Sequence, residues 1–326
     1  MPKVFISRRI GQEAIDLITP HAEVTAWKKE EAPAREELFR LIADKEGLIV
    51  WLDKVDAEFL DAAAKVKVIA HRAAGFDNID VDEATKRGIM ICNAPRGVIE
   101  ATADFAFGLM LACARKIVEA VNTTFKGKWK IWDPMGVPYL GDDVHHRTLG
   151  IVGMGRIGSE VAKRAKGFSM KVIYYDIVRN PREAELGAEY ISDLPTLLSM
   201  SDFVTIHMPL NRDTRHLIGA KELAAMKPTA ILVNTSRGGT VDQKALYEAL
   251  KGKQIQAAAI DVTEKEPIAP DDPLLTLDNI IISPHIAGGS KVARLEMDLL
   301  AAENIIAALK GKPMPSCVNC HLLDKE

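Results

Sequence analysis

The stretch LGIVGMGRIGSEVAKRAKG, residues 149–167, decides the fold. An apolar run precedes three glycines spaced as GxGxxG, and an amphipathic segment of helical period follows them. Glycines at this spacing permit a tight turn, a close approach of the backbone to a pyrophosphate, and close packing of a helix on a strand. The helix N-terminus then offers N–H groups to the anion. The pattern predicts a dinucleotide site at Gly153, Gly155 and Gly158.

An acidic residue completes this motif. The next apolar run, KVIYYD, ends at Asp176, which lies 176 − 153 = 23 positions after Gly153. A carboxylate there accepts hydrogen bonds from the adenosine ribose and repels a 2′-phosphate, so we expect NAD in preference to NADP. Arg179, three residues on, is a cation that would soften this preference. The alternative is a glycine-rich turn without a ligand, and the combination of strand, turn, helix and acid argues against it.

Apolar runs alternate with helical-period segments on both sides of the motif. Continuous apolar strands separated by helices indicate parallel sheets that are covered on both faces. We expect one sheet from residues 3–6, 22–27, 47–52, 66–71 and 89–93. We expect a second from residues 148–153, 171–176, 188–191, 203–208, 230–235, 256–262 and 279–283. Helices are expected over residues 35–43, 81–87, 101–125 and 290–309.

Composition and charge exclude several classes of protein. The 326 residues suffice for two domains, and 48% hydrophobic with 27% charged residues predicts packed cores. The net charge of −3 gives no reason to expect nucleic acid or an anionic membrane as a partner. Neither a signal peptide nor a long apolar span is visible, so we expect a cytoplasmic protein. The predicted fold class is α/β, with two Rossmann-like or flavodoxin-like domains, parallel sheets and an active-site cleft between them.

The cysteines are sparse, and reduced thiols are expected of them. Cys317-Val-Asn-Cys320-His321 matches both a CxxC pair and the attachment pattern of c-type haem. Haem attachment of that kind needs export, for which the sequence shows no signal. We therefore interpret the match as chance in a polar tail, and we expect no metal site.

Three charged residues each follow a predicted strand of the second sheet: Arg237, Glu266 and His285. The carboxyl ends of parallel strands share one edge of a sheet, where ligands bind. Arginine offers a fork for a carboxylate and a charge near a carbonyl oxygen. Histidine exchanges a proton near neutral pH, and a glutamate on its other ring nitrogen would orient it. Each residue alone has an ordinary explanation as a surface cation, a loop carboxylate or a core histidine, but together they predict the acid–base site of a hydride transfer.

Several of these motifs together resemble one family. GMGRIG, TSRGG, DVTEKEP and SPHIAGG are similar to motifs of the D-isomer-specific 2-hydroxyacid dehydrogenases, most of all the glyoxylate/hydroxypyruvate reductases. HRAAGFDNIDVDEATKRGI and TADFAFGLMLACAR extend the resemblance over nearly the whole chain. It implies that Arg237 binds and polarises the substrate, that Glu266 supports the histidine, and that His285 is the acid/base. Thr263 stands where the family usually has an aromatic residue, a departure that concerns local packing.

The resemblance also implies domains and ligand contacts. Residues 1–99 and 290–326 would form the substrate domain, and residues 100–289 the NAD-binding Rossmann domain. The substrate would meet the N–H groups of Ala74 and Gly75 as well as Arg237 and His285. The expected cofactor-binding residues are Thr102, Gly153, Gly155, Arg156, Ile157, Gly158, Asp176, His207, Thr235, Ser236, Arg237, Asp261, His285, Ala287 and Gly288.

A homodimer is the expected assembly, because the family dimerises through the region that corresponds to residues 101–140. Met110, Leu111, Trp129 and Trp132 would supply its apolar surface. The alternative is that these residues only pack the helix onto its own domain.

The expected reaction is the reduction of glyoxylate or hydroxypyruvate by NADH. Formate enzymes carry glutamine where Glu266 stands, and phosphite enzymes carry lysine where Ala74 stands. Phosphoglycerate enzymes usually carry a basic residue on the loop that here reads WLDK, residues 51–54. D-3-phosphoglycerate and D-lactate dehydrogenases remain alternatives. An NAD-sensing corepressor that binds other proteins is the alternative of another class, because such proteins keep the same triad.

Overall fold

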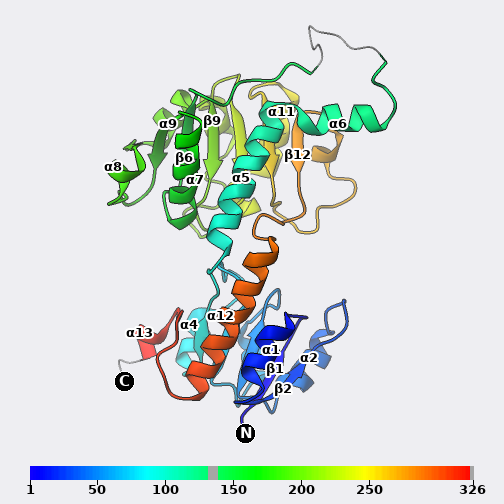
Figure 1. The fold of residues 1–326 in the computed structure, drawn as a ribbon, viewed down its shortest axis with the longest axis vertical. Coiled ribbons are helices and arrows are strands. Elements are labelled where there is room, and N and C mark those ends of the chain that lie inside the picture. Colours follow the sequence, from blue (N-terminus) through cyan, green and yellow to red (C-terminus); the bar gives the residue numbers. More distant parts are fainter. Residues whose placement is uncertain (131–138, 324–326) are drawn as a thin grey trace. The chain divides into compact units, whose positions relative to one another are not determined.

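The computed structural model describes residues 1–130 and 139–323, and the chain divides into two compact α/β units (Figure 1). Unit 1 comprises Met1–Val98 and Gly289–Glu326, and unit 2 comprises Ile99–Gly288. Each unit is built on one parallel sheet, which confirms the predicted fold class of two Rossmann-like α/β units.

The sheet of unit 1 has the strand order β2-β1-β3-β4-β5. Strands β3 and β4 are buried at every position, which explains why they read as continuous apolar runs. The C-terminal helix α12 packs on β3, β4 and α1, so the end of the chain completes this unit. The strands are β1 Lys3–Ile6, β2 Glu23–Ala26, β3 Gly47–Val50, β4 Val68–His71 and β5 Met90–Cys92. The helices are α1 Gln12–Ile18, α2 Arg35–Ile42, α3 Ala57–Ala62, α4 Val81–Lys86, α12 Lys291–Leu309 and α13 Cys320–Leu323.

The sheet of unit 2 has the strand order β12-β11-β10-β9-β6-β7-β8. The direction of winding reverses between β6 and β9, and ligands of open α/β sheets bind at the carboxyl ends beside such a switch point. The strands are β6 Thr148–Val152, β7 Lys171–Tyr175, β8 Ala188–Tyr190, β9 Phe203–Ile206, β10 Ile231–Asn234, β11 Ala257–Ile260 and β12 Ile280–Ile282. The helices are α5 Val98–Ala114, α6 Ile117–Phe125, α7 Arg156–Gly167, α8 Glu183–Leu186, α9 Leu194–Met200, α10 Ala220–Ala225 and α11 Gln243–Lys251, with short 3-10 turns at Gly238–Thr240 and Pro273–Thr276.

Two apolar clusters cover the faces of this second sheet. One includes residues of α5 and α7, and the other includes residues of α9, α10 and α11. The sheet is therefore buried on both sides, and its carboxyl edge is where polar side chains gather.

The prediction of a single helix over residues 101–125 was wrong. Lys116 has a φ of 50°, in the left-handed region, and separates α5 from α6. The carbonyl of Ala114 at the end of α5 accepts a hydrogen bond from the N–H of Asp142 at 2.8 Å. A contact between residues so far apart in sequence stops the helix, and the apolar periodicity that continues through residue 121 cannot show it.

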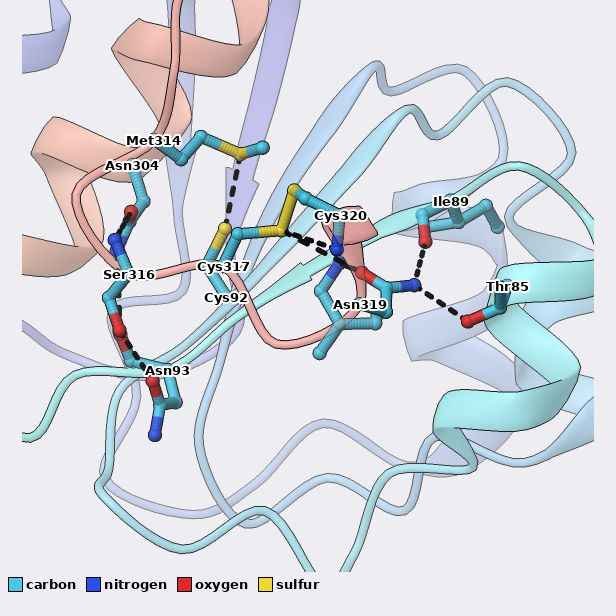
Figure 2. The surroundings of a disulfide bond; sticks show 11 residues. Thr85, Ile89, Cys92, Asn93, Asn304, Met314, Ser316, Cys317, Asn319 and Cys320 are labelled. Atoms are coloured by element: carbon cyan, nitrogen blue, oxygen red, sulfur yellow. Dashed lines mark hydrogen bonds between the residues drawn. A yellow bond between two sulfur atoms is a disulfide. The ribbon is translucent and has the colours of Figure 1, made fainter. Parts of the chain in front are cut away.

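The prediction of four reduced thiols was wrong for one pair. Cys317 and Cys320 form a disulfide, and the tail that carries them docks on unit 1 (Figure 2). Cys92 and Cys113 are free and buried. Burial raises the pKa of each of these two thiols to about 12, so both stay protonated near neutral pH.

Candidate active site

The glycine turn of unit 2 connects β6 to α7. Gly153 has a φ of 98°, and a β-carbon there would lie 2.8 Å from the carbonyl carbon of His207. A β-carbon at Gly158 would lie 2.2 Å from the carbonyl oxygen of Gly153. At Gly155 no atom of the described residues, apart from its chain neighbours, lies within 4 Å of the β-carbon position. Two glycines thus allow the turn to pack tightly, and the third leaves its backbone open to a ligand, which is the arrangement that a pyrophosphate needs.

Asp176 lies beside this turn, directly after β7. Its carboxylate accepts a hydrogen bond from the N–H of Met154 at 2.7 Å. The side-chain amide of Asn180 donates to the carbonyl of Met154 at 2.7 Å. The acid is therefore held next to the glycine turn, where a ribose would meet it.

The guanidinium of Arg179 contacts other side chains of unit 2. Its guanidinium forms an ion pair with Glu183. Its central carbon lies 5.2 Å from the centre of the Tyr190 ring. A 2′-phosphate would have to compete with Glu183 for this cation.

Two buried side-chain atoms at the carboxyl ends of β9 and β10 have no hydrogen-bond partner among the described residues: His207 Nδ1 and Thr235 Oγ1. The other ring nitrogen of His207 lies 2.8 Å from Thr205 Oγ1. Burial lowers the pKa of His207 to about 3, so its ring is neutral at physiological pH. Buried polar atoms without partners are costly in free energy. They fit a polar ligand at this edge, and with the open glycine turn they fit a nicotinamide dinucleotide.

The loop that carries Arg237 follows β10 and is braced by Asn234. The Asn234 side chain accepts hydrogen bonds from the N–H of Ser236 at 3.0 Å and from its hydroxyl at 2.9 Å. It also donates to the carbonyl of Arg237 at 3.1 Å. Asn234 is only 1% exposed. Sequence reasoning missed this residue, whose only signal is its position just before TSRGG at a strand end.

The loops after β10 and β11 touch through their backbones. A β-carbon at Gly238 would lie 2.0 Å from the carbonyl carbon of Thr263, so only glycine fits there. Thr263, which replaces the family's usual aromatic residue, is buried, and its hydroxyl donates to the carbonyl of Lys265 at 2.8 Å. Its N–H donates to Glu266 Oε1 at 3.2 Å. The threonine therefore shapes the turn that presents Glu266.

Glu266 and His285 form a hydrogen-bonded pair. His285 Nδ1 and Glu266 Oε2 lie 2.7 Å apart. Burial raises the pKa of the Glu266 carboxyl, but the His285 hydrogen bond, the Thr263 N–H and the Arg237 charge together lower it below its ordinary value. The three predicted catalytic side chains thus interact at the ends of the adjacent strands β10, β11 and β12.

Asp261 holds the His285 loop in place. His285 has a left-handed φ of 53°, and its N–H donates to the Asp261 carbonyl at 2.9 Å. The Asp261 carboxylate accepts hydrogen bonds from the N–H of Ile286 at 2.9 Å, the N–H of Ala287 at 2.7 Å and the hydroxyl of Ser283 at 2.5 Å. At 1% exposure it serves as a buried brace. From the sequence, Asp261 was expected only as a residue that binds the cofactor.

The other predicted cofactor residues also lie in unit 2. Arg156 and Ile157 open α7, Thr102 is buried in α5, and Gly288 is the last residue of the unit. Within residues 1–130 and 139–323, no group of three or more His, Cys, Asp or Glu side chains is arranged to hold a metal ion.

In unit 1, the loop after β4 carries Ala74 and Gly75. The carbonyl of Ala74 accepts a hydrogen bond from the side-chain amide of Asn93 at 2.7 Å, and the carbonyl of Ala73 accepts one from the N–H of Ala94 at 2.8 Å. In the described part of the chain, the N–H groups of Ala74 and Gly75 donate no hydrogen bond. The loop is thus anchored by its carbonyls, and its N–H groups remain available to a carboxylate.

Trp51 follows β3 at the same edge of that sheet. Two guanidiniums lie close to its ring, with distances to the ring centre of 4.8 Å for Arg72 and 4.7 Å for Arg294. Arg72 is buried and paired with Asp298. Arg294 has no carboxylate partner in the described residues, and burial together with the nearby Arg72 charge lowers its pKa. Sequence reasoning missed this pair of cations, because both are distant in sequence from the loop of residues 51–54.

Comparison with known proteins identifies the family. Residues 107–287 match the description "D-isomer specific 2-hydroxyacid dehydrogenase, NAD binding domain". A glyoxylate reductase of Korarchaeum cryptofilum is 50% identical over 98% of this chain and 96% of its own. The chain belongs to this family. A crystal structure of a Thermus thermophilus protein has a TM-score of 0.91 at 40% identity, covering 97% of this chain and 99% of that one.

The chain is therefore an oxidoreductase of the D-2-hydroxyacid dehydrogenase family. A solved relative with 27% identity and a TM-score of 0.82 covers 97% of this dehydrogenase and 96% of its own chain. It is described as an NADPH-dependent glyoxylate/hydroxypyruvate reductase of Sinorhizobium meliloti in complex with NADP and malonate. The family therefore includes members for either dinucleotide, and family membership alone does not select one.

Only part of the apolar surface expected for a dimer of this dehydrogenase is exposed. Met110 is only 2% exposed and belongs to the core of unit 2, so its assignment to the surface was wrong. Leu111 is partly buried against the same core. Trp129 is 64% exposed, and Trp132 lies outside the described residues. Among the described residues, no helix has the length and apolar character needed to cross a membrane.

Proposed function

We propose that this dehydrogenase reduces a small 2-oxo acid, glyoxylate or hydroxypyruvate, to the 2-hydroxy acid with NADH. The observation that carries the proposal is the 2.7 Å pair of His285 and Glu266 beside Arg237, on a sheet whose glycine turn fits a dinucleotide. The 50% identity to a protein named glyoxylate reductase supports the choice of substrate.

The residues divide the chemistry between them. When bound, the dinucleotide supplies a hydride to the carbonyl carbon. His285 Nε2 gives a proton to the carbonyl oxygen, while Glu266 on Nδ1 orients the ring and stabilises the imidazolium. Arg237 polarises the carbonyl and binds the carboxylate. In unit 1, the N–H groups of Ala74 and Gly75, which donate no hydrogen bond among the described residues, would bind a substrate carboxylate.

The preference for NADH rests on Asp176. Its carboxylate is fixed beside the glycine turn, and Arg179 is already paired with Glu183. A 2′-phosphate would therefore meet a negative charge, and Arg179 is engaged by Glu183. The ratio of kcat/KM values with NADH and NADPH tests this preference, and equal or better turnover with NADPH would overturn it.

A homodimer is part of the proposal. Helix α6 buries none of its residues, and Phe125 at its end is 87% exposed. Exposed apolar side chains gathered on one segment are typical of a protein interface. The exposed apolar residues of this segment are Ile117, Val118, Val121, Phe125 and Trp129. Light scattering should give twice the mass of the chain, and a monomer at micromolar concentration would exclude the dimer.

A substrate panel with both cofactors tests the proposed function. The panel compares the kcat/KM values for glyoxylate, hydroxypyruvate, pyruvate and 3-phosphohydroxypyruvate, the oxidised form of 3-phosphoglycerate. Preference for the phosphorylated acid would favour the second candidate, a phosphoglycerate dehydrogenase. Arg294 supports this candidate, because it forms no ion pair with a carboxylate in the described residues and could bind a phosphate. A preference for pyruvate would favour a D-lactate dehydrogenase. Intact NADH binding with no turnover on any acid would favour a corepressor-like binding protein.

A further inference from the structure

We propose that the Cys317–Cys320 disulfide is a redox-sensitive clip that positions the loop of Ala74 and Gly75. The proposal rests on the proposed function in one respect, because it takes this loop to bind the substrate carboxylate. The clip, its connection to the loop, and the loop itself all lie in unit 1.

The disulfide closes a four-residue turn around a buried asparagine. Asn319 lies between the two cysteines and is 0% exposed. The N–H of Cys320 lies 3.1 Å from Cys317 Sγ, which tightens the same turn. Figure 2 shows the Asn319 side chain directed at the edge of the sheet. Its amide donates to Thr85 Oγ1 at 2.8 Å and to the carbonyl of Ile89 at 3.0 Å, and its oxygen accepts from the N–H of Ile91 at 2.8 Å.

The clip thereby covers an edge strand. β5 is the last strand of the sheet in unit 1, and its outer N–H and C=O groups need partners. The N–H of Val318 donates to the carbonyl of Ile91 at 2.8 Å, and Asn319 accepts from the N–H of the same residue. The four-residue turn therefore satisfies both polar groups of Ile91.

A chain of hydrogen bonds leads from the clip to the substrate loop. Ser316, the neighbour of Cys317, is held by its N–H, which donates to Asn304 Oδ1 at 3.0 Å. Its hydroxyl donates to Asn93 Oδ1 at 2.6 Å (Figure 2). The amide of Asn93 donates to the carbonyl of Ala74 at 2.7 Å. Both ends of the Asn93 side chain are used, so Ser316 fixes the orientation in which Asn93 anchors the loop.

The third cysteine nearby does not replace either member of the clip. Cys92 pairs with Cys317 as an isolated antiparallel bridge, and its thiol donates to Met314 Sδ at 3.2 Å. Disulfide exchange requires a thiolate, and this thiol is buried with a pKa raised to about 12. Exchange is therefore confined to Cys317 and Cys320.

The redox step is a thiol–disulfide exchange. Two thiols lose two protons and two electrons as the S–S bond forms, and a small-molecule disulfide takes them up and becomes two thiols. A dithiol reverses the reaction. Reduction removes the covalent closure of the turn, so the hydrogen bonds of Asn319 and Ser316 must hold it without that constraint. The loop of Ala74 and Gly75 then loses part of its support.

A thiol count and hydrogen exchange test the clip without any activity measurement. The denatured protein should show two reactive thiols after treatment with oxidised glutathione and four after dithiothreitol. Amide exchange at Ile91 should be faster in the reduced protein, because its acceptor is Asn319. Four thiols under both conditions, or equal exchange at Ile91 in both forms, would overturn the proposal.

Steady-state kinetics test the link to the loop. Reduction should raise KM for glyoxylate by roughly two- to tenfold, with kcat nearly unchanged, as is typical of coupling through a packed network. Ser316→Ala should raise KM in the oxidised protein as well. The Cys317→Ser/Cys320→Ser double variant should behave like the reduced protein and ignore dithiothreitol, which controls for effects of the reductant elsewhere. An unchanged KM in a protein whose thiol count has changed from two to four would overturn the link.

Absence of turnover on every 2-oxo acid would overturn the proposed function instead, while the thiol count and the amide exchange at Ile91 still report on the clip.

Discussion

A methyl group at Gly238 should separate the loops that carry Arg237 and Glu266. The β-carbon of an alanine would lie 2.0 Å from the carbonyl carbon of Thr263, where ordinary contacts begin at 3.4 Å. The two backbones must therefore part by 3.4 − 2.0 = 1.4 Å. A misplacement of about 1 Å near the reacting atoms costs on the order of a hundredfold in rate. We expect Gly238→Ala to lower kcat/KM for glyoxylate by about this factor.

The assay for this variant follows NADH oxidation with glyoxylate, together with NADH affinity by fluorescence. NADH affinity separates an effect on the catalytic loops from a loss of cofactor binding, because the glycine turn after β6 is built from other residues. Gly108→Ala is the matched control. Gly108 lies exposed in α5, and apart from its own helix backbone no atom of the described residues lies within 4 Å of its β-carbon position. The control should keep full activity and gain about 0.5–1 kcal/mol of stability. A Gly238→Ala enzyme with wild-type kcat/KM would refute the reasoning.

Three further predictions concern single side chains. Arg237→Ala should raise KM for glyoxylate and lower kcat together. The combined loss in kcat/KM should be roughly 10- to 150-fold, as expected for charge-assisted hydrogen bonds. A change in KM alone would contradict the role of Arg237 on the reacting carbonyl. Asp176→Asn should shift the ratio of kcat/KM values from NADH toward NADPH by about tenfold or more, whereas an unchanged ratio would remove Asp176 from cofactor selection. Folding lowers the pKa of Glu266 below its ordinary value of 4.5. The ionised carboxylate therefore stabilises the folded state above about pH 4.5, and this stabilisation is lost as the pH falls through the folded pKa. Glu266→Gln should therefore flatten the pH dependence of the unfolding free energy below about pH 4.5. An unchanged slope there would contradict the pairing with His285.

Much of the fold could be predicted from the sequence, because buried parallel strands are continuous apolar runs. Strands such as β3 and β10 lie within the predicted runs, since every position in them is buried. The GxGxxG turn was recognisable because its spacing follows from steric contacts that the structure shows at Gly153 and Gly158. The residues Arg237, Glu266 and His285 come together because β10, β11 and β12 are neighbours, and parallel strands end at one edge.

Other features depend on tertiary contacts that no local pattern reveals. The break between α5 and α6 follows from a hydrogen bond between Ala114 and Asp142. Asn234 and Asp261 brace the catalytic loops by bonding backbone groups whose positions are set only by the folded chain. The Cys317–Cys320 disulfide is different, because the CxxC spacing was visible in the sequence and only the sparse cysteine content argued for reduced thiols.

The central claim is that His285 gives the proton during reduction of a 2-oxo acid, and turnover of His285→Gln tests it most directly. The measurement is the rate of NADH oxidation at saturating glyoxylate, with NADH affinity determined on the same sample. The hydrogen bond between Glu266 Oε2 and His285 Nδ1 fixes the orientation of the imidazole. We predict a loss of roughly a hundredfold or more in kcat with NADH affinity retained. A variant that turns over glyoxylate at the wild-type rate would contradict the claim and return His285 to a structural role.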